Sequence, residues 1–270
     1  MKKLLAGLGF SVVIASGLFA NSLMMATTTS TEDTGLLDYL APQFEKQTGT
    51  NLKWVSTGTG KALKMGENCD VDVLLVHAPE AEKKFVEAGF GVDRNEVMYN
   101  DFVIIGPKND PAGVTGKTIS EAFKIIKEKN ISFLSRADNS GTHQKELSMW
   151  EKVSKIVPEK DTWYVQTGQG MIATINMAAE KAGYTLTDRG TWIKYESQKG
   201  ELNNMKIVVE NDNILFNQYS VITVNKDRCP NVKTQLAKDF TNWILKDETQ
   251  KFIGNFKLLE KPLFTPNAKK

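Results

Sequence analysis

The stretch VDVLLV at 71–76 decides the fold class of this chain. It is apolar except for Asp72 and has the length of one strand, which is typical of a strand buried on both faces of a parallel sheet. Strand-like runs also occur at 23–26 and 51–55, and a helix-like pattern follows each of them. This alternation predicts an α/β fold with a parallel sheet and right-handed crossovers.

Two longer strand patterns predict how the chain divides. Residues 100–107 have no helix pattern directly behind them, so we expect this strand to cross into a second lobe. Residues 219–224 would cross back, and 232–245 would form a last helix on the first lobe. Two crossings between α/β lobes predict a hinged clamshell of two mixed sheets flanked by helices. We expect lobe I to comprise 21–103 and 218–270, and lobe II 104–217.

The first twenty residues predict a signal peptide. Lys2 and Lys3 precede an apolar run, and the small residue Ala20 marks the expected cleavage site. A transmembrane anchor is the alternative, but the run is short and no charged stop follows it. We therefore expect a cleaved protein exported to the periplasm.

Charge and cysteine content exclude some classes of partner. The chain has 34 basic and 32 acidic residues, a net charge of +2 that falls to zero without Lys2 and Lys3. A neutral protein has no net positive charge to attract nucleic acid or an anionic membrane. A bound anion would therefore have to be held by local dipoles and hydrogen-bond donors. Cys69 and Cys229 permit a disulfide but do not require one, and two unpaired cysteines are an equally good interpretation.

Three segments rich in hydroxyl and glycine residues, 27–31, 56–61 and 135–142, each join a predicted strand to a predicted helix. The start of a helix carries unpaired N–H groups and the positive end of the dipole, which favour an anion. Ligands of α/β sheets collect at this edge of the strands. Arg136 is the only arginine in these segments. Its planar, charged guanidinium can donate hydrogen bonds to the oxygens of an oxyanion. Ordinary N-caps and a surface pair between Arg136 and Asp138 are the alternatives.

The helix after the first segment carries two local signals. Ser30 and Asp33 have the spacing of a capping box, which predicts a helix that starts at Ser30. Pro42 lies within the helical pattern and predicts a kink.

Other chemistries have weaker support. Segment 56–61 is not a Walker A loop, because Val55 stands where that motif needs glycine. His77 and His143 lack metal-ligand spacing, so we expect no metal cation and no cofactor. A secreted serine hydrolase that uses Ser140 and His143 is an alternative, although the chain has no Gly-x-Ser-x-Gly elbow. Gly170, in a turn before a predicted helix, is a further candidate for the anion site.

Taken together, these motifs resemble the tungstate-binding proteins of TupA-type ABC importers. The resemblance is nearly continuous from residue 27 to about 145 and thinner afterwards. It rests on TTTST at 27–31, GLLD at 35–38, FEKQTG at 44–49, TGTG at 57–60, DVLLVHAP at 72–79, VMYNDFV at 97–103, GP at 106–107, DPAG at 110–113, and SR at 135–136 with Asp138 and SGTH at 140–143.

The resemblance implies a type II periplasmic binding protein that delivers tungstate to an ABC permease in the inner membrane, without a catalytic step. We expect a monomer. Molybdate or another tetrahedral oxyanion is the alternative ligand, because tungstate and molybdate share charge, shape and nearly the same size. The candidate ligand-binding residues that the resemblance implies are Thr28, Thr29, Ser30, Thr59, Gly60, Arg136 and Thr142. Ser140 and Gly170 are further candidates from the residues alone.

Overall fold

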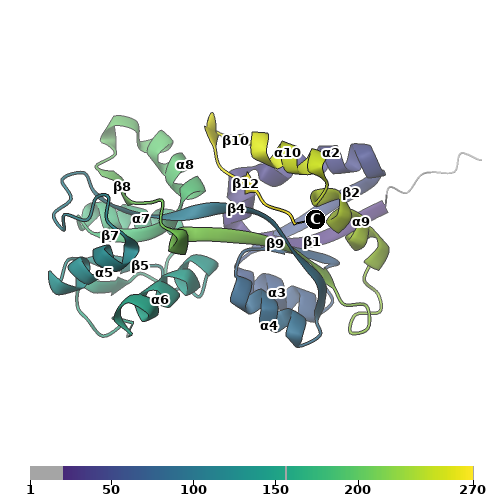
Figure 1. Cartoon of the computed structure of the whole chain (residues 1–270), viewed down its shortest axis with the longest axis horizontal. Helices are drawn as coiled ribbons and strands as arrows, with labels where there is room; N and C mark the ends of the chain where they lie inside the picture. The colour runs from purple at the N-terminus through teal and green to yellow at the C-terminus, as the bar shows by residue number, and fades with distance from the viewer. Residues whose placement is uncertain (1–20, 156, 270) are drawn as a thin grey trace, which may run out of the picture.

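The computed structural model describes residues 21–155 and 157–269, so the predicted signal peptide lies outside the described residues. Figure 1 shows two lobes side by side along the long axis, joined by the strands β4 (Gly91–Pro107) and β9 (Phe216–Val224). Helices cover both faces of the sheet in each lobe. The expected α/β clamshell with two crossing strands is confirmed.

The lobe I sheet brings the ends of its parallel strands to one edge. β1 (Asn21–Thr28) pairs in parallel with β2 (Thr50–Thr57) and with β3 (Val73–Val76). The register places Thr28 opposite Thr57. The hydroxyl-rich segments that follow β1 and β2 therefore begin at the same edge of the sheet, as the sequence predicts.

Lobe I has a hydrophobic core on each face of this sheet. Because side chains alternate along a strand, Leu23 and Met25 face one core while Ala26 faces the other. Phe44 packs edge-on against Phe240 in the first core, with ring centroids 5.2 Å apart. The helices around the two cores are α1 (Thr29–Thr34), α2 (Leu36–Thr48), α3 (Thr59–Glu67), α4 (Pro79–Glu87), α9 (Thr234–Ile244) and α10 (Asp247–Asn255).

Lobe II is built on the second part of β4. This strand pairs with β9 as far as Asp101, and from Phe102 it pairs with β7 (Tyr184–Asp188). The two sheets are therefore continuous through β4; the lobe boundaries at 103/104 and 217/218 stay predictions. The other elements are β5 (Phe133–Ser135), β6 (Tyr164–Gln166), β8 (Met205–Val209), α5 (Ile119–Glu128), α6 (Gly141–Ser154), α7 (Met171–Glu180) and α8 (Arg189–Lys199).

The first helix differs from the prediction. Thr28, not Ser30, is its N-cap, because the N–H of Thr31 donates to Thr28 Oγ1 at 3.2 Å. The predicted capping box is therefore wrong. The helix ends at Gly35, whose φ of 77° a glycine adopts without strain, and α2 then runs through Pro42 to Thr48 without a break. Pro42 has no N–H to bond the carbonyl four residues earlier, so α2 lacks that hydrogen bond, and the kink expected at Pro42 stays a prediction.

Cys69 and Cys229 form a disulfide, which decides between the two interpretations left open by the sequence. The bond ties the turn after α3 to the segment that follows β9, across 160 residues of sequence. Within the described ranges, no helix is long and apolar enough to cross a membrane.

Candidate functional site

A cavity of about 350 Å³ lies where the three hydroxyl-rich segments meet. Thr29, at the start of α1, and the turn before and into α3 line it from lobe I. The loop between β5 and α6 lines it from lobe II. The cavity therefore has one wall on each lobe, as the predicted clamshell requires. Its lining residues are Thr29, Gly58, Gly60, Lys61, Arg136, Asp138, Asn139 and Ser140.

A larger cavity of about 640 Å³ lies within lobe II, between the segment before α5 and the segment after β8. Its charged lining side chains are Lys117, Glu210 and Asp212, so acidic groups outnumber the single basic one. That lining suits an anion poorly, and the cavity between the lobes is the better candidate site.

The end of β1 supplies a cluster of hydroxyl groups on the lobe I wall. Thr28 is only 3% exposed, and its Oγ1 lies 3.0 Å from Ser30 Oγ and 2.7 Å from Thr31 Oγ1. Thr29 is exposed and lines the cavity. Thr28 thus supports the cluster from behind, while Thr29 faces the space a ligand would occupy.

The turn before α3 presents open backbone amides. Gly58 is the N-cap of α3 and has no side-chain cap, and a Cβ added at Gly58 or Gly60 would have no atom within 4 Å. The unhindered N–H groups at this helix start are suited to an anion. Thr59 is 1% exposed, and its Oγ1 has no hydrogen-bond partner among the described residues. Lys61 adds a positive charge that the sequence analysis did not include in the site.

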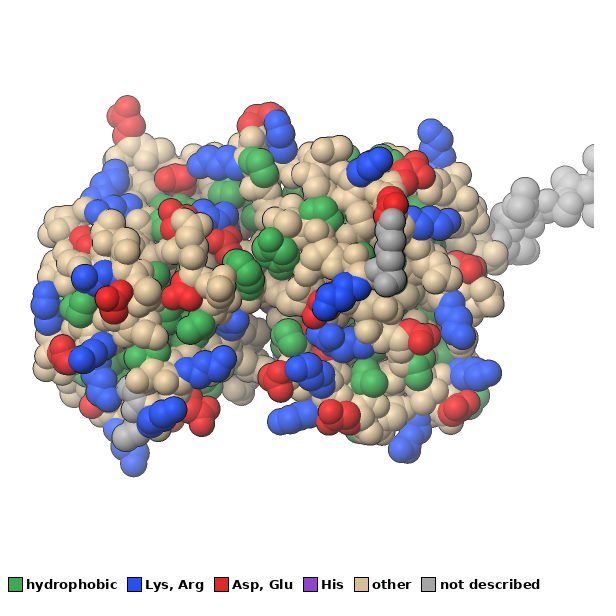
Figure 2. Space-filling view, viewed as in Figure 1, with side chains coloured by type: hydrophobic (Ala, Val, Ile, Leu, Met, Phe, Trp, Pro, Cys, Tyr) green, Lys and Arg blue, Asp and Glu red, His purple; other side chains and the backbone are tan. Residues whose placement is uncertain are grey.

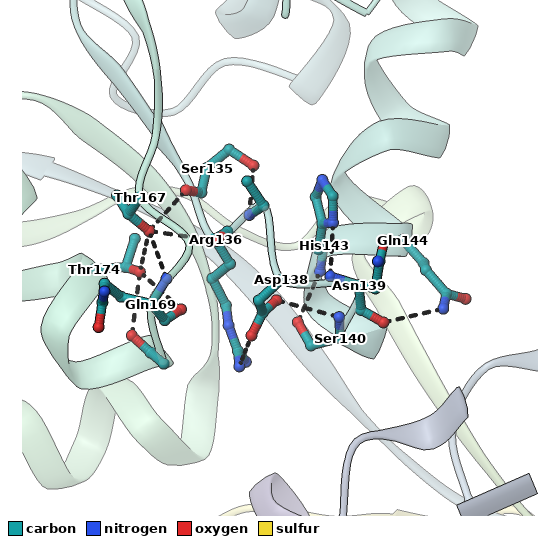
Figure 3. A network of polar contacts seen from close by, with 12 residues as sticks. Ser135, Arg136, Asp138, Asn139, Ser140, His143, Gln144, Thr167, Gln169 and Thr174 are labelled. Carbon is teal, nitrogen blue, oxygen red and sulfur yellow. Dashed lines mark hydrogen bonds and ion pairs between the residues drawn. The ribbon is translucent and has the colours of Figure 1, made fainter. Parts of the chain in front are cut away.

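The loop after β5 positions Arg136 on the lobe II wall. Thr167 Oγ1 donates to the carbonyl of Ser135 at 2.9 Å and lies 3.0 Å from Thr174 Oγ1, which ties this loop to α7 (Figure 3). Ala137 and Asn139 have φ values of 48° and 58°, in the left-handed region that costs a residue with a Cβ about 1–2 kcal/mol. The backbone therefore turns sharply on either side of Asp138.

Arg136 and Asp138 form the ion pair that was the alternative interpretation of the sequence, but it does not lie on the open surface. Arg136 Nη2 lies 2.5 Å from Asp138 Oδ2, with side chains 14% and 21% exposed (Figure 3). The guanidinium is not fully used, because Arg136 Nε is buried without a partner among the described residues. Arg136 Nε and Thr59 Oγ1, from opposite lobes, thus remain unpaired beside the same cavity.

Asp138 stays ionised in this site. Burial raises the pKa of its carboxyl, but the hydrogen bonds from Ser140 and the charge of Arg136 outweigh burial and lower the pKa. The N–H of Ser140 donates to Asp138 Oδ1 at 3.1 Å. Asp138 therefore offsets the charge of Arg136, which leaves much of the anion binding to amides and hydroxyls.

The structure groups most of the predicted residues but not all of them. Thr29, Gly60, Arg136 and Ser140 line the cavity, and Thr28, Ser30 and Thr59 lie next to lining residues. Thr142 lies two residues beyond Ser140, in the first turn of α6, and does not line the cavity. Gly170 is the N-cap of α7 and is not among the described residues that line the cavity. Gly58, Lys61, Asp138 and Asn139 also line it and were not predicted; adjacency to the predicted residues was the available signal.

Ser140 and His143 do not form a nucleophile and base. The backbone N–H of His143 donates to Ser140 Oγ at 3.3 Å, while the ring Nδ1 of His143 accepts from the N–H of Asn139 at 3.1 Å (Figure 3). This is helix capping. No group of three side chains able to hold a metal ion occurs in the described part of the chain.

The surface around the lobes carries mixed charge. Figure 2 shows acidic and basic side chains interspersed over one face of both lobes, with a constriction between them. No single sign dominates this face, which agrees with the nearly neutral composition.

Comparison with known proteins identifies the family. Residues 20–248 match the PBP superfamily domain. The tungstate-binding protein TupA of Campylobacter jejuni is 52% identical over 240 residues, which are 89% of each chain. The solved tungstate-binding protein TupA of Desulfovibrio alaskensis G20 is 63% identical with a TM-score of 0.87, over 93% of this chain and 100% of that one.

A second solved structure, described as the tungstate ABC transporter from Geobacter sulfurreducens, is 47% identical with a TM-score of 0.76. The match covers 87% of this chain and 98% of that one. The family-model match, residues 20–248, includes every segment that lines the cavity. The chain therefore belongs to the PBP superfamily and, within it, to the family of TupA tungstate-binding proteins.

Proposed function

We propose that this protein binds tungstate in the cavity between its lobes and delivers it to the permease of an ABC importer. Two unpaired buried donors, Arg136 Nε and Thr59 Oγ1, carry this proposal, because Arg136 lines the cavity from lobe II and Thr59 lies between two lining residues of lobe I, Gly58 and Gly60. A buried donor without a partner costs about 1–3 kcal/mol, and a bound oxyanion would remove that cost.

The donors suit a dianion that carries no proton. Helix-start amides at Gly60 and hydroxyls at Thr29 and Ser140 would donate to its oxygens, and Arg136 and Lys61 would supply positive charge. Closure would add the donors of the second lobe to those of the first, so the ligand would shift the population toward the closed form.

The hydrogen bonds of the Asp138 carboxylate affect which oxyanions can bind in the cavity. Each oxygen of its carboxylate already accepts a bond, from Ser140 or from Arg136. Each oxygen keeps a second lone pair, so weak binding of hydrogen phosphate requires that these lone pairs face away from the anion; we expect that orientation and therefore weak phosphate binding. Molybdate has the charge and shape of tungstate and stays the alternative ligand.

The family membership supports a location in the periplasm, a permease partner in the inner membrane and a role without catalysis. We also infer that the protein acts as a monomer and that tungstate is its cargo and not a cofactor. Each of these inferences follows from the role of a binding protein that hands its ligand to a transporter.

Titration calorimetry of the purified protein tests the proposal. Tungstate, molybdate, sulfate and phosphate would be titrated under the same conditions. We expect one tungstate per protein and much weaker binding of sulfate and phosphate. Equal binding of molybdate would broaden the ligand to both metal oxyanions, and no heat with any of the four would overturn the proposal.

A further inference from the structure

His77 lies behind the anion site and belongs to none of the ligand contacts described above. It follows β3 directly and is 7% exposed. Its Nε2 lies 3.0 Å from both Thr28 Oγ1 and Ser30 Oγ. One imidazole nitrogen therefore contacts two hydroxyls of the cluster at the end of β1.

The other ring nitrogen connects to the strand that crosses between the lobes. His77 Nδ1 lies 2.9 Å from Asn217 Oδ1, and Asn217 Nδ2 donates to Asn100 Oδ1 at 2.7 Å. Asn217 belongs to β9, and Asn100 to β4. With Asn217 in this orientation its oxygen accepts, so Nδ1 carries the ring proton and Nε2 carries the lone pair.

A lone pair on Nε2 decides how the two hydroxyls can point. A neutral imidazole nitrogen accepts along one direction, so one of the two O–H groups donates to it. Thr28 is the more deeply buried of the pair, and its hydroxyl is enclosed by other polar groups. With Thr28 donating to Nε2 and accepting from the N–H of Thr31, the partly exposed hydroxyl of Ser30 is released from Nε2 and can turn its hydrogen from Thr28 Oγ1, 3.0 Å away, to an anion.

We propose that His77 is a positioning residue of the anion site, which holds Thr28 so that the Ser30 hydroxyl donates to the bound oxyanion. This inference rests on the proposed function. It adds a group that does not touch the ligand and yet sets the direction of a donor that does.

His77 also lies close to the opposite lobe. A Cβ built on Gly141, the first residue of α6, would lie 3.3 Å from His77 Cε1 and 3.3 Å from Thr59 Oγ1. The ring stacks on Tyr219 of β9, with centroids 4.7 Å apart. His77 is therefore held by the crossing strand and lies near the start of the lobe II helix, which suits a group that holds others in place.

The basicity of the ring argues against a catalytic role. Ser30, His77 and Asn217 are linked in the order of a nucleophile, a base and an orienting group. Burial, with a smaller contribution from the charge of Arg136, lowers the pKa of His77 to about 4 despite the opposing hydrogen bond with Asn217. A base this weak is poorly matched to proton transfer at neutral pH.

Two substitutions separate the contacts of the two nitrogens. In His77→Gln the amide reaches the position of Nε2 and keeps a contact with Thr28. In His77→Asn the shorter amide reaches the position of Nδ1 and keeps only the contact with Asn217. Both lose the stack on Tyr219, so we expect similar drops in melting temperature. We expect tungstate affinity within about fivefold of wild type for Gln, and at least a tenfold loss for Asn.

The outcomes distinguish this inference from the proposed function. Wild-type protein that fails to bind tungstate overturns the proposed function. Wild-type binding with equal losses in both variants, or with none in His77→Asn, overturns the positioning role alone. Should either variant fail to fold, nitrogen NMR of wild-type His77 replaces it: a proton on Nδ1 supports the inference, and one on Nε2 overturns it.

Discussion

Replacing Arg136 by alanine removes a charge-assisted donor and also frees Asp138. In the wild type the two side chains lie 2.5 Å apart, and the guanidinium neutralises the carboxylate beside the cavity. After Arg136→Ala, a bound dianion would face Asp138 without that compensation. The carboxylate would still accept from the N–H of Ser140, which keeps it ionised and in place.

Two terms give the size of the expected loss. A hydrogen bond to a charged group contributes about 1.5–3 kcal/mol. A carboxylate at about 5 Å from a unit negative charge costs roughly 3 kcal/mol at an effective dielectric constant of about 20. Even with part of the repulsion screened, the loss should exceed about 3 kcal/mol, which is more than a hundredfold in affinity.

Titration calorimetry with tungstate measures this loss, and two further variants test its origin. Adding Asp138→Asn to Arg136→Ala removes the repulsion, so the double variant should recover at least tenfold of the lost affinity. Arg228→Ala makes the same change of charge near Phe90, away from the cavity, and should bind like wild type. Affinity of Arg136→Ala within threefold of wild type, or a loss no larger than that of Arg228→Ala, would refute the reasoning.

Three other changes have defined outcomes. Gly141→Ala puts a Cβ 3.3 Å from His77 Cε1, which is tighter than most contacts of a Cβ, so calorimetry should show several-fold weaker tungstate binding; unaltered affinity would contradict a close approach of the lobes at Gly141. Replacing Cys69 and Cys229 by serine should lower the free energy of unfolding by about 2–4 kcal/mol and leave tungstate affinity unchanged. Denaturant unfolding measures this free energy, and a smaller decrease would contradict the prediction. Burial raises the pKa of Glu146 to about 7, so the folded state holds its proton more tightly than the unfolded state. The free energy of unfolding of the wild type should therefore fall by roughly 3 kcal/mol relative to that of Glu146→Gln as the pH rises from about 4.5 to 7. Parallel profiles of unfolding free energy against pH for the two proteins would refute this.

The sequence was sufficient for the fold class because strand and helix periods alternate along both lobes. It missed β7 and α8, where Tyr184–Asp188 and the following helix carry mixed polar and apolar residues. It also missed α10, so the expectation that 232–245 forms the last helix on the first lobe is wrong. It also misplaced the start of α1, since Thr28 and Ser30 are equally good caps by residue type and only the position of Thr31 decides between them.

The sequence predicted which segments form the site, but it predicted fewer of the contacts between their side chains. Strand order brings the ends of β1 and β2 to one edge, and this follows from the parallel sheet. The partners of single side chains do not follow from it. The engagement of Asp138 with Arg136, and the placement of His77 behind Thr28, depend on packing between segments far apart in the sequence.

A crystal structure of the protein with tungstate, phased on the anomalous scattering of tungsten, would show where the anion binds. We expect a single strong tungsten peak in the cavity between the lobes, within hydrogen-bonding reach of Arg136 and of the turn at Thr59 and Gly60. A tungsten peak elsewhere on the molecule, or none in this cavity at saturating tungstate, would contradict it.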